Sequence, residues 1–160
     1  MDAHATSVRP QAAAREVLTF RMCGQEYGVD ILKVQEIRSY GAVTRIPDVA
    51  DFVMGLLNLR GVIVPVVDLR LRFRLAGAAH EADAVMIVLN IGSRTIAAVV
   101  DGVSDVVALA PTQVLPPPDL ATVDSRSLAG LGVVDQRMLI LLDVDTLFAD
   151  SPHAALAAAA

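Results

Sequence analysis

Apolar and polar residues alternate from Glu16 onward, which predicts a strand with one buried face. In this pattern the side chains that point inward are Leu18, Phe20 and Met22, and those that point outward are Val17, Thr19 and Arg21. Residues 24–26 supply a hairpin turn that leads into a second strand at residues 27–29. Asp30 is placed to cap a short helical turn over residues 31–34, after which residues 36–40 return to a strand.

The next segment combines a helix signal with a strand signal. Asp48 or Asp51 can cap a short helix, which we expect to include Phe52, Val53, Met54 and Leu57. Gly61 ends this helix, and residues 62–69 form a nearly all-apolar strand. Pro65 lies inside that strand and cannot donate to a β-ladder, so it predicts an edge position or a bulge.

The second half follows a similar plan of short strands separated by turns. We expect strands at residues 85–91, 95–100 and 138–143, an apolar run at 106–109 and a break at the three prolines 116–118. Because the helices are few and short, the pattern favours a mainly β protein built from paired small β-barrels.

One stretch of 22 residues occurs twice, 75 positions apart. Residues 53–74 and 128–149 align without a gap, and the coinciding pairs are Gly55/Gly130, Leu56/Leu131, Asp68/Asp143 and Phe73/Phe148. Each copy runs from a Gly-Leu pair into an apolar strand, then an aspartate and then an aromatic residue, as expected when one supersecondary unit is used twice. A looser match, which needs a gap, relates residues 34–37 to residues 103–106.

The repeat defines the expected organisation of the chain. We expect a disordered arm over residues 1–15, one domain over residues 16–150 and an Ala-rich tail over residues 151–160. The approximate halves of the domain are residues 16–76 and 84–148, and whether their strands interleave stays open at this point.

Composition narrows the class of protein. With 160 residues, 54% of them apolar, the chain holds one ordinary domain or two very small ones that share a core. Apolar runs such as 84–89 and 138–142 are far shorter than the roughly 18 to 20 residues of a membrane span, so we expect no transmembrane helix. The N-terminus does not look like a secretory signal. The single cysteine, Cys23, cannot form an internal disulfide, which favours a reduced thiol.

The charge distribution argues against nucleic acid as the main partner. The formal net charge is −5, whereas neutralising phosphates needs an excess of cations. The local exception is residues 60–74, which contain four arginines. We interpret this segment as a solvated turn or a protein-contact face. A nucleic-acid patch is the alternative, although no aromatic ladder for base stacking accompanies it.

No catalytic or metal-binding motif stands out. The three histidines, His4, His80 and His153, fall in the arm, the linker and the tail, where they cannot easily build a metal site or supply a catalytic base. Ser104 has acidic neighbours but no histidine to activate it. We therefore expect no cofactor. Catalysis by carboxylates alone stays open, although nothing in the sequence selects it.

Five residues are candidates for contact with a partner. Val34 and Ile37 have the spacing of core residues, and Glu36 is a charge between them, which suits either a contact or a solvated face. Arg60 can orient a partner's carboxylate, or can complement the C-terminal dipole of a helix. Asn58 is more simply a cap or a residue that tolerates a left-handed turn.

Four stretches closely resemble the CheW family of bacterial chemotaxis coupling proteins. These are YGVDILKVQEIR at residues 27–38, NLRGVIVPVVDLR at 58–70, VVDGVSDV at 99–106, and GLG at 130–132 with MLIL at 138–141. The resemblance covers residues 16–148. It implies two five-stranded SH3-like β-barrels, no enzymatic activity, and a cytoplasmic protein without direct membrane insertion that joins membrane-associated chemoreceptor arrays.

The resemblance also implies partners and their sites. It places receptor coupling at Val34, Glu36 and Arg60, to which Ile37 and Asn58 are added as neighbours in the same motifs. The groove between the barrels would take the helical hairpin of the receptor tip. Contacts with the regulatory domain of the histidine kinase CheA are expected at barrel ends, for which Gly55 and Val106 are the candidates. The alternatives are a small-ligand-binding or enzymatic β-barrel and a nucleic-acid-binding barrel.

Overall fold

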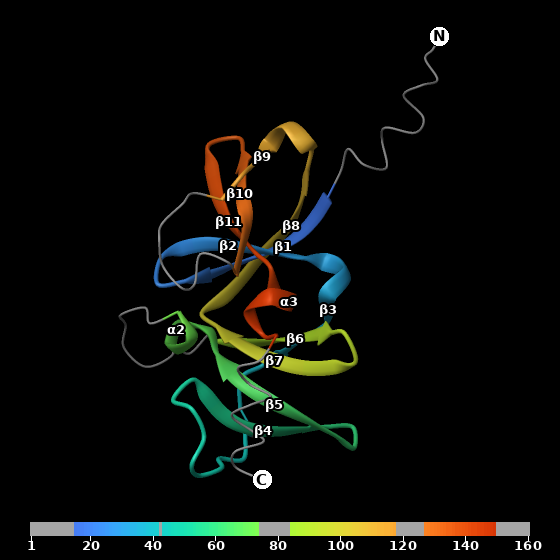
Figure 1. The fold of residues 1–160 in the computed structure, drawn as a ribbon, viewed down its shortest axis with the longest axis vertical. Coiled ribbons are helices and arrows are strands. Elements are labelled where there is room, and N and C mark those ends of the chain that lie inside the picture. The colour runs from blue at the N-terminus through green and yellow to red at the C-terminus, as the bar shows by residue number, and fades with distance from the viewer. Residues whose placement is uncertain (1–14, 42, 74–83, 118–126, 150–160) are drawn as a thin grey trace.

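Two β-sheets, stacked along the long axis of the molecule, make up the fold (Figure 1). This computed structural model describes residues 15–41, 43–73, 84–117 and 127–149. The first sheet has the strand order β8 (Gly102–Leu109), β1 (Arg15–Met22), β2 (Gln25–Asp30), β11 (Arg137–Leu142), β10 (Leu128–Val134) and β9 (Val114–Leu115). The second has the order β3 (Val34–Ser39), β6 (Val85–Ile91), β7 (Arg94–Val100), β5 (Val62–Asp68) and β4 (Val53–Leu59).

Short helices connect the strands. The 3-10 turns are η1 (Ile31–Lys33) and η2 (Pro111–Gln113), and the α-helical turns are α2 (Leu69–Arg72) and α3 (Val144–Leu147). Asp30 caps η1 as predicted, because its side chain accepts a hydrogen bond from the Leu32 backbone N–H. In Figure 1, α3 lies between the two sheets. The prediction of a mainly β protein with short helices is confirmed, and one sheet has the five expected strands.

Each sheet takes strands from both halves of the sequence. The hairpin β1–β2 is flanked by β8 and β11, whereas the hairpin β6–β7 is flanked by β3 and β5. Antiparallel pairing links β1 with β8 and β3 with β6, and parallel pairing links β2 with β11 and β5 with β7. The chain therefore exchanges β3 and β8 between its two sheets.

Both sheets curl toward closed barrels. In the second sheet, Thr44 follows β3 and exchanges two backbone hydrogen bonds of 2.8 Å with Leu56 of β4, which lies at the opposite edge. In the first sheet, β8 leads through η2 into β9, which pairs with β10 at the far edge. Both closures use the segment that follows the exchanged strand, as an SH3-like barrel requires. Below, the barrel formed by the first sheet is called barrel A and that formed by the second barrel B.

The apolar residues of the described ranges form three cores. The largest joins the facing sides of the two sheets and includes Phe20, Met22, Ile87, Leu89 and Phe148. Barrel B encloses a second core, and barrel A a third. The members of the third core are Val17, Leu109, Leu139 and Leu141. Central strands are therefore covered on both faces, which explains the near-continuous apolar sequences of β6 and β7.

This double coverage corrects the prediction for the first strand. Leu18, Phe20 and Met22 point into the core between the barrels, as expected. Val17 and Thr19 are also buried, because their side of β1 faces the interior of barrel A. Only Arg21 of the three predicted outward residues is exposed. Alternation alone cannot reveal that a second core covers the other face.

The predicted helix over Phe52, Val53, Met54 and Leu57 is wrong. This segment is strand β4, in which Val53, Gly55, Leu57 and Leu59 are buried on alternate positions. A period of two is the pattern of a strand, and burial of these residues in barrel B outweighs the capping potential of Asp48 and Asp51. Nor is β5 an edge strand, because it lies between β4 and β7. Pairing with β7 begins at Val66, so Pro65 lies just before it.

The duplication predicted from the sequence is confirmed by matching hydrogen bonds. The Asp68 backbone N–H donates to the Phe52 carbonyl at 2.8 Å, and 75 residues later the Asp143 N–H donates to the Ser127 carbonyl at 2.7 Å. Both aspartates then cap the following helical turn with their side chains. Gly55 and Gly130 lie at equivalent bulges with φ of 147° and 154°. The shared residues of the repeat therefore serve the fold.

Candidate interaction surfaces

Glu36 and Arg60 meet on the outside of barrel B. A bulge in β3, between Val34 and Glu36, shifts the register against β6 and brings Glu36 opposite Val88. Arg60 occupies the turn between β4 and β5, where it has φ of 52° and is followed by Gly61 at φ of 90°. Positive φ at both positions is the requirement of a two-residue type I′ hairpin turn. This turn directs the Arg60 side chain toward Glu36, across the line where β4 and the segment after β3 close barrel B.

The pair forms a two-pronged contact. Arg60 Nη2 lies 2.5 Å from Glu36 Oε2, and Nη1 donates to Oε1 at 3.4 Å. Arg38 Nη1 lies 3.8 Å from the same carboxylate. The hydrogen bonds that Arg60 donates to Glu36 hold the pKa of Glu36 below its usual value, and the same bonds raise the pKa of Arg60. The Arg60 side chain is still 64% exposed, so the pair is open to a partner.

Asn58 supports the turn that carries Arg60. Its side-chain Oδ1 accepts a hydrogen bond of 2.8 Å from the Gly61 backbone N–H. The interpretation of Asn58 as a helix cap or a left-handed turn residue is wrong, because Asn58 lies in strand β4 and the positive φ angles fall on Arg60 and Gly61. The idea that Arg60 complements a helix dipole is wrong, because β4 precedes the turn and no helix ends there. Asn58 and Arg60 are thus brought together by one hairpin.

Exposed apolar side chains accompany the pair. Ile37 follows Glu36 on β3, and Val62 and Ile63 follow the Arg60 turn on β5; all three are exposed. Val34 is half-buried and packs against the core between the barrels. Sequence reasoning did not single out Val62 and Ile63, because it described residues 62–69 only as a nearly all-apolar strand. The Arg60-Gly61 turn could have revealed the exposure of Ile63, because a two-residue turn there places Ile63 opposite the polar Asn58.

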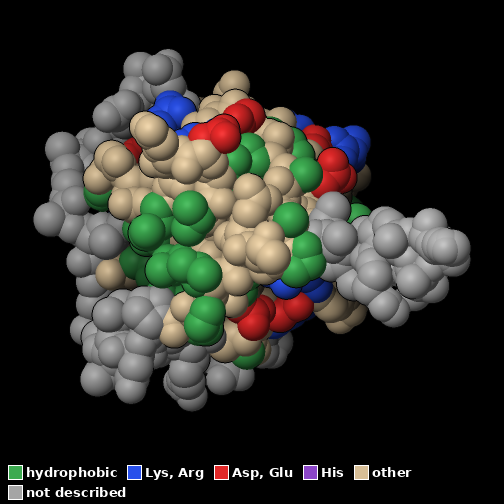
Figure 2. Space-filling view, turned by 90° about the horizontal axis from the view of Figure 1, so that it is seen from above, with side chains coloured by type: hydrophobic (Ala, Val, Ile, Leu, Met, Phe, Trp, Pro, Cys, Tyr) green, Lys and Arg blue, Asp and Glu red, His purple; other side chains and the backbone are tan. Residues whose placement is uncertain are grey.

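The two residues predicted for kinase contact lie on different barrels. Gly55 is buried in β4, and a Cβ added there would lie 2.1 Å from the Thr44 carbonyl oxygen. Its glycine is therefore required for closing barrel B. Val106 lies on β8 at the edge of barrel A and is 50% exposed. Viewed from that end, the molecule shows hydrophobic side chains with acidic groups around them (Figure 2).

The arginines after Arg60 do not form the single solvated or partner-facing surface that was predicted. Arg70 is only 9% exposed and forms ion pairs with Asp68 at 3.9 Å and Asp101 at 3.6 Å. Arg72 Nη2 donates to the Leu147 carbonyl at 3.4 Å. These contacts fasten α2 and α3 to the body of the molecule. Arg74 lies outside the described residues.

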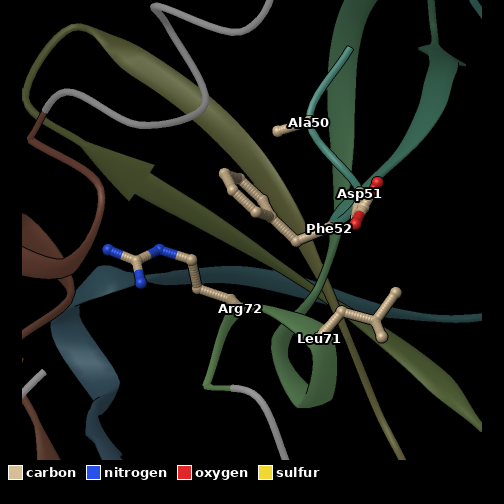
Figure 3. Close-up of a pocket in the computed structure, with 5 residues that line it drawn as sticks. All are labelled: Ala50, Asp51, Phe52, Leu71 and Arg72. Carbon is tan, nitrogen blue, oxygen red and sulfur yellow. The ribbon is translucent and has the colours of Figure 1, made fainter.

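An open pocket of about 530 Å³ lies beside α2. Its lining consists of Ala50, Asp51, Phe52, Leu71 and Arg72. The Arg72 guanidinium carbon is 5.6 Å from the centre of the Phe52 ring, and the two side chains face each other in Figure 3. The pocket contains none of the predicted contact residues.

A second charged cluster was not anticipated. Arg137 of β11 contacts both Glu26 of β2 and Asp105 of β8, and Thr19 of β1 also binds Asp105. The looser match between residues 34–37 and 103–106 already aligned Glu36 with Asp105, and this was the available signal. Each exchanged strand thus places an acidic residue at its bulge, Glu36 on β3 and Asp105 on β8. An arginine from a neighbouring hairpin, Arg60 or Arg137, binds that acidic residue.

Other features concern metals and membranes. Within the described ranges, no group of three or more His, Cys, Asp or Glu side chains could hold a metal ion. His4, His80 and His153 all lie outside those ranges. No helix of the described residues is long and apolar enough to cross a membrane.

Comparison with known proteins assigns the family. The model of the CheW-like domain matches residues 16–151. The chain is 48% identical over 145 residues to the chemotaxis protein CheW of Klebsiella aerogenes, covering 90% of this chain and 87% of that protein. It is 36% identical to the chemotaxis protein CheW of Rhizobium meliloti, covering 84% and 87%. The crystal structure of the scaffolding protein TtCheW from Thermoanaerobacter tengcongensis superposes with a TM-score of 0.79 at 30% identity, covering 84% of this chain and 92% of that one.

Paired barrels with exposed charged and apolar side chains are typical of a protein-interaction module. The chain belongs to the CheW-like family and has the function of a chemotaxis adaptor or scaffold.

Proposed function

We propose that this protein couples the cytoplasmic tip of a chemoreceptor to the regulatory domain of the histidine kinase CheA, within membrane-associated receptor arrays. It would act in the cytoplasm by holding the two partners together, without chemistry of its own. The observation that carries this proposal is the Glu36–Arg60 pair, whose arginine is largely exposed, on a barrel that also exposes Ile37, Val62 and Ile63. Such a surface offers hydrogen-bonding specificity and apolar burial to a protein partner.

We assign receptor binding to Val34, Glu36, Ile37, Asn58 and Arg60. In this assignment Glu36, Ile37 and Arg60 make direct contacts, while Asn58 holds the turn and Val34 anchors the start of β3. The exposure of Leu32 supports a binding site for the receptor's helical hairpin between the two barrels. Leu32 is 84% exposed on η1, the segment that leads from β2 in barrel A to β3 in barrel B. The ion pair of 2.8 Å between Lys33 and Asp145 fixes η1 against α3.

Kinase binding is assigned to the barrel ends, with Val106 as a direct contact. Gly55 would act indirectly, because its backbone closes barrel B. An exposed valine on an edge strand can be buried when another barrel docks there. The family match favours the adaptor over a ligand-binding, enzymatic or nucleic-acid-binding barrel.

Reconstitution of receptor, kinase and this protein tests the proposal. We expect receptor control of kinase activity only when all three components are present. The matched control is an Arg60→Asp variant, which should bind the kinase but restore little receptor control. Full receptor control in the absence of the protein would contradict the coupling role.

A further inference from the structure

The cluster around Arg137 lies at the open end of barrel A. Side chains alternate along a strand, so Arg137 points to the same side as Leu139, a member of the core inside barrel A. By the same rule Thr19 shares a side with Val17, and Asp105 shares one with Val107, which also packs on this core. The charged groups therefore sit on top of the apolar interior and cover its end.

Arg137 binds two carboxylates at once. Its Nε and Nη2 donate to Glu26 at 3.0 and 2.8 Å, and its Nη2 and Nη1 donate to Asp105 at 3.0 and 3.2 Å. Two-pronged contacts of this kind fix the orientation of both partners. They draw β2, β8 and β11 together although β8 is paired with β1 and is separated from β11 in the sheet.

Strand β8 depends on side chains at this point. The ladder between β1 and β8 is regular from Arg15 to Leu18 but shifts before Phe20, so a bulge falls at Ser104 and Asp105. The Asp105 backbone N–H donates to the Thr19 hydroxyl oxygen at 3.0 Å instead of to a strand carbonyl, and the same hydroxyl donates to the Asp105 carboxylate. Val106 pairs with Leu18 as the last residue of the regular ladder, and because the bulge interrupts ladder bonding directly before it, these contacts hold the side of Val106 that the ladder leaves unsupported.

The corresponding pair on barrel B is arranged differently. Arg60 is 64% exposed and binds one carboxylate, whereas Arg137 is 33% exposed and binds two. Val62 stands at the position 75 residues before Arg137 and is exposed. Barrel B therefore presents its arginine outward. Barrel A ties its arginine to two carboxylates, of which Asp105 is itself 48% exposed, and presents Val106 beside them.

We propose that Arg137 is a positioning residue for kinase binding: it fixes the bulge of β8 and thereby holds Val106 in the orientation that the kinase recognises. This proposal rests on the kinase-binding role assigned to Val106 above. It implies that Arg137 acts through β8 without touching the partner.

Affinity measurements on the full-length protein test this role. Arg137→Gln removes the charged contacts with both Glu26 and Asp105. Asp105→Asn removes only the charge of Asp105 and leaves the contact with Glu26 in place. The second variant therefore tests the proposal even if the first does not fold. We expect either variant to bind the kinase about 5- to 20-fold more weakly and the receptor within about twofold of wild type, in the range of a broken charged hydrogen bond. Arg137→Lys should bind the kinase more tightly than Arg137→Gln but more weakly than wild type, because an ammonium group cannot form two-pronged hydrogen bonds with both carboxylates.

A double-mutant cycle separates positioning from general stability. If Arg137 acts through Val106, then Arg137→Gln should weaken kinase binding much less in a Val106→Ala background than in wild type. Arg94→Gln is the matched control, since Arg94 donates to the Phe148 carbonyl at 2.7 Å and stabilises α3 elsewhere; this variant should bind the kinase normally below its melting temperature. Unchanged kinase binding, additive effects with Val106→Ala, or equal losses for both partners would overturn the positioning role. Failure of wild type to bind the kinase would instead refute the proposed function.

Discussion

At the scale of single residues, the turn position shared by Arg60 and Asp135 shows how one scaffold carries different surfaces. Both residues have left-handed backbone, with φ of 52° and 55°, in equivalent hairpins. Aspartate tolerates this conformation well, because its short polar side chain can hydrogen-bond locally. The fold therefore requires a turn residue at this position but does not require a positive charge.

Arg60→Asp should consequently leave the melting temperature nearly unchanged and strongly weaken receptor binding. The substitution replaces the attraction to Glu36 with repulsion, at a side chain that is largely exposed. Circular dichroism and a receptor-binding titration would measure the two effects. The mirrored change, Asp135→Arg, serves as the control and should spare receptor binding. An unfolded Arg60→Asp variant would show that the arginine serves the fold.

The Glu36 carboxyl should titrate below its usual pKa, and this shift should become clearly smaller in Arg60→Gln, where Gln35 and Arg38 still favour the charged form. A depressed pKa in the folded state means that the pair adds stability above the unfolded pKa and loses that contribution as the pH falls through the lowered, folded pKa. NMR titration of the Glu36 carboxyl in both proteins would measure the shift. Identical titration curves would mean that the pair does not form in solution.

At the scale of elements, the repeated aspartates link strand ends to helical turns. Asp143 Oδ1 accepts from the Thr146 N–H at 3.2 Å, and Asp68 Oδ1 accepts from the Arg70 N–H at 2.9 Å. Asp68 is in addition buried next to the Arg70 guanidinium. The two caps are equivalent in position. Asp68 also neutralises the charge of the Arg70 guanidinium, whereas Asp143 caps its helical turn.

Replacement of each aspartate by alanine should therefore destabilise the protein by different amounts. We expect Asp143→Ala to lower the free energy of unfolding by about 1 kcal/mol through loss of the cap. Asp68→Ala should lower it by about 2 to 3 kcal/mol, because a buried cation also loses one of its carboxylates. Urea denaturation would measure both values. Unchanged stability in both variants would refute their structural role.

Gly55→Ala should disrupt the closure of barrel B. The added methyl would lie 2.1 Å from the Thr44 carbonyl oxygen, on a backbone with φ of 147°. We expect a loss of about 3 kcal/mol or more in the free energy of unfolding, beyond the range of ordinary substitutions. The control is Gly92→Ala, where φ is 62° but the space is open, so only about 1 to 2 kcal/mol should be lost. Equal losses at the two sites would contradict the closure argument.

Local signals predicted the local elements of this fold. The cap at Asp30, the repeated aspartates and the strands at residues 85–91, 95–100 and 138–143 follow from short-range chemistry and were placed correctly, whereas β9 and β10 were not predicted and β8 only in part. The burial of Val17 and Thr19 and the strand at residues 53–59 depend on a barrel closed by distant segments, so their own patterns did not reveal them. The ion pair between Glu36 and Arg60 joins opposite edges of a sheet, and only the fold brings it together.

At the scale of the whole molecule, the exchange of β3 and β8 makes each half incomplete without the other. Residues 1–76 contain β1 and β2 without β8 or β11, and β4 and β5 without β6 or β7. The core between the barrels likewise draws on both halves. We therefore propose that the two halves are not independent folding units.

Expression of the halves as separate polypeptides tests this view. Each half alone should lack cooperative thermal unfolding, because isolated hairpins without covering layers are marginally stable in water. Mixing the two should restore a folded complex with a single transition. A cooperatively folded residue 1–76 fragment would contradict the proposed dependence.

The pairing of β1 with β8 has a consequence for the order of events during protein synthesis. Arg15 lies opposite Leu109, and Tyr27 of β2 lies opposite Ile140 of β11. The ribosome must therefore release most of the polypeptide before its first hairpin can find both neighbours. Until then two apolar strands have unpaired edges, a condition that favours aggregation and attracts chaperones. The earliest residues to be translated are thus among the last to reach their final environment.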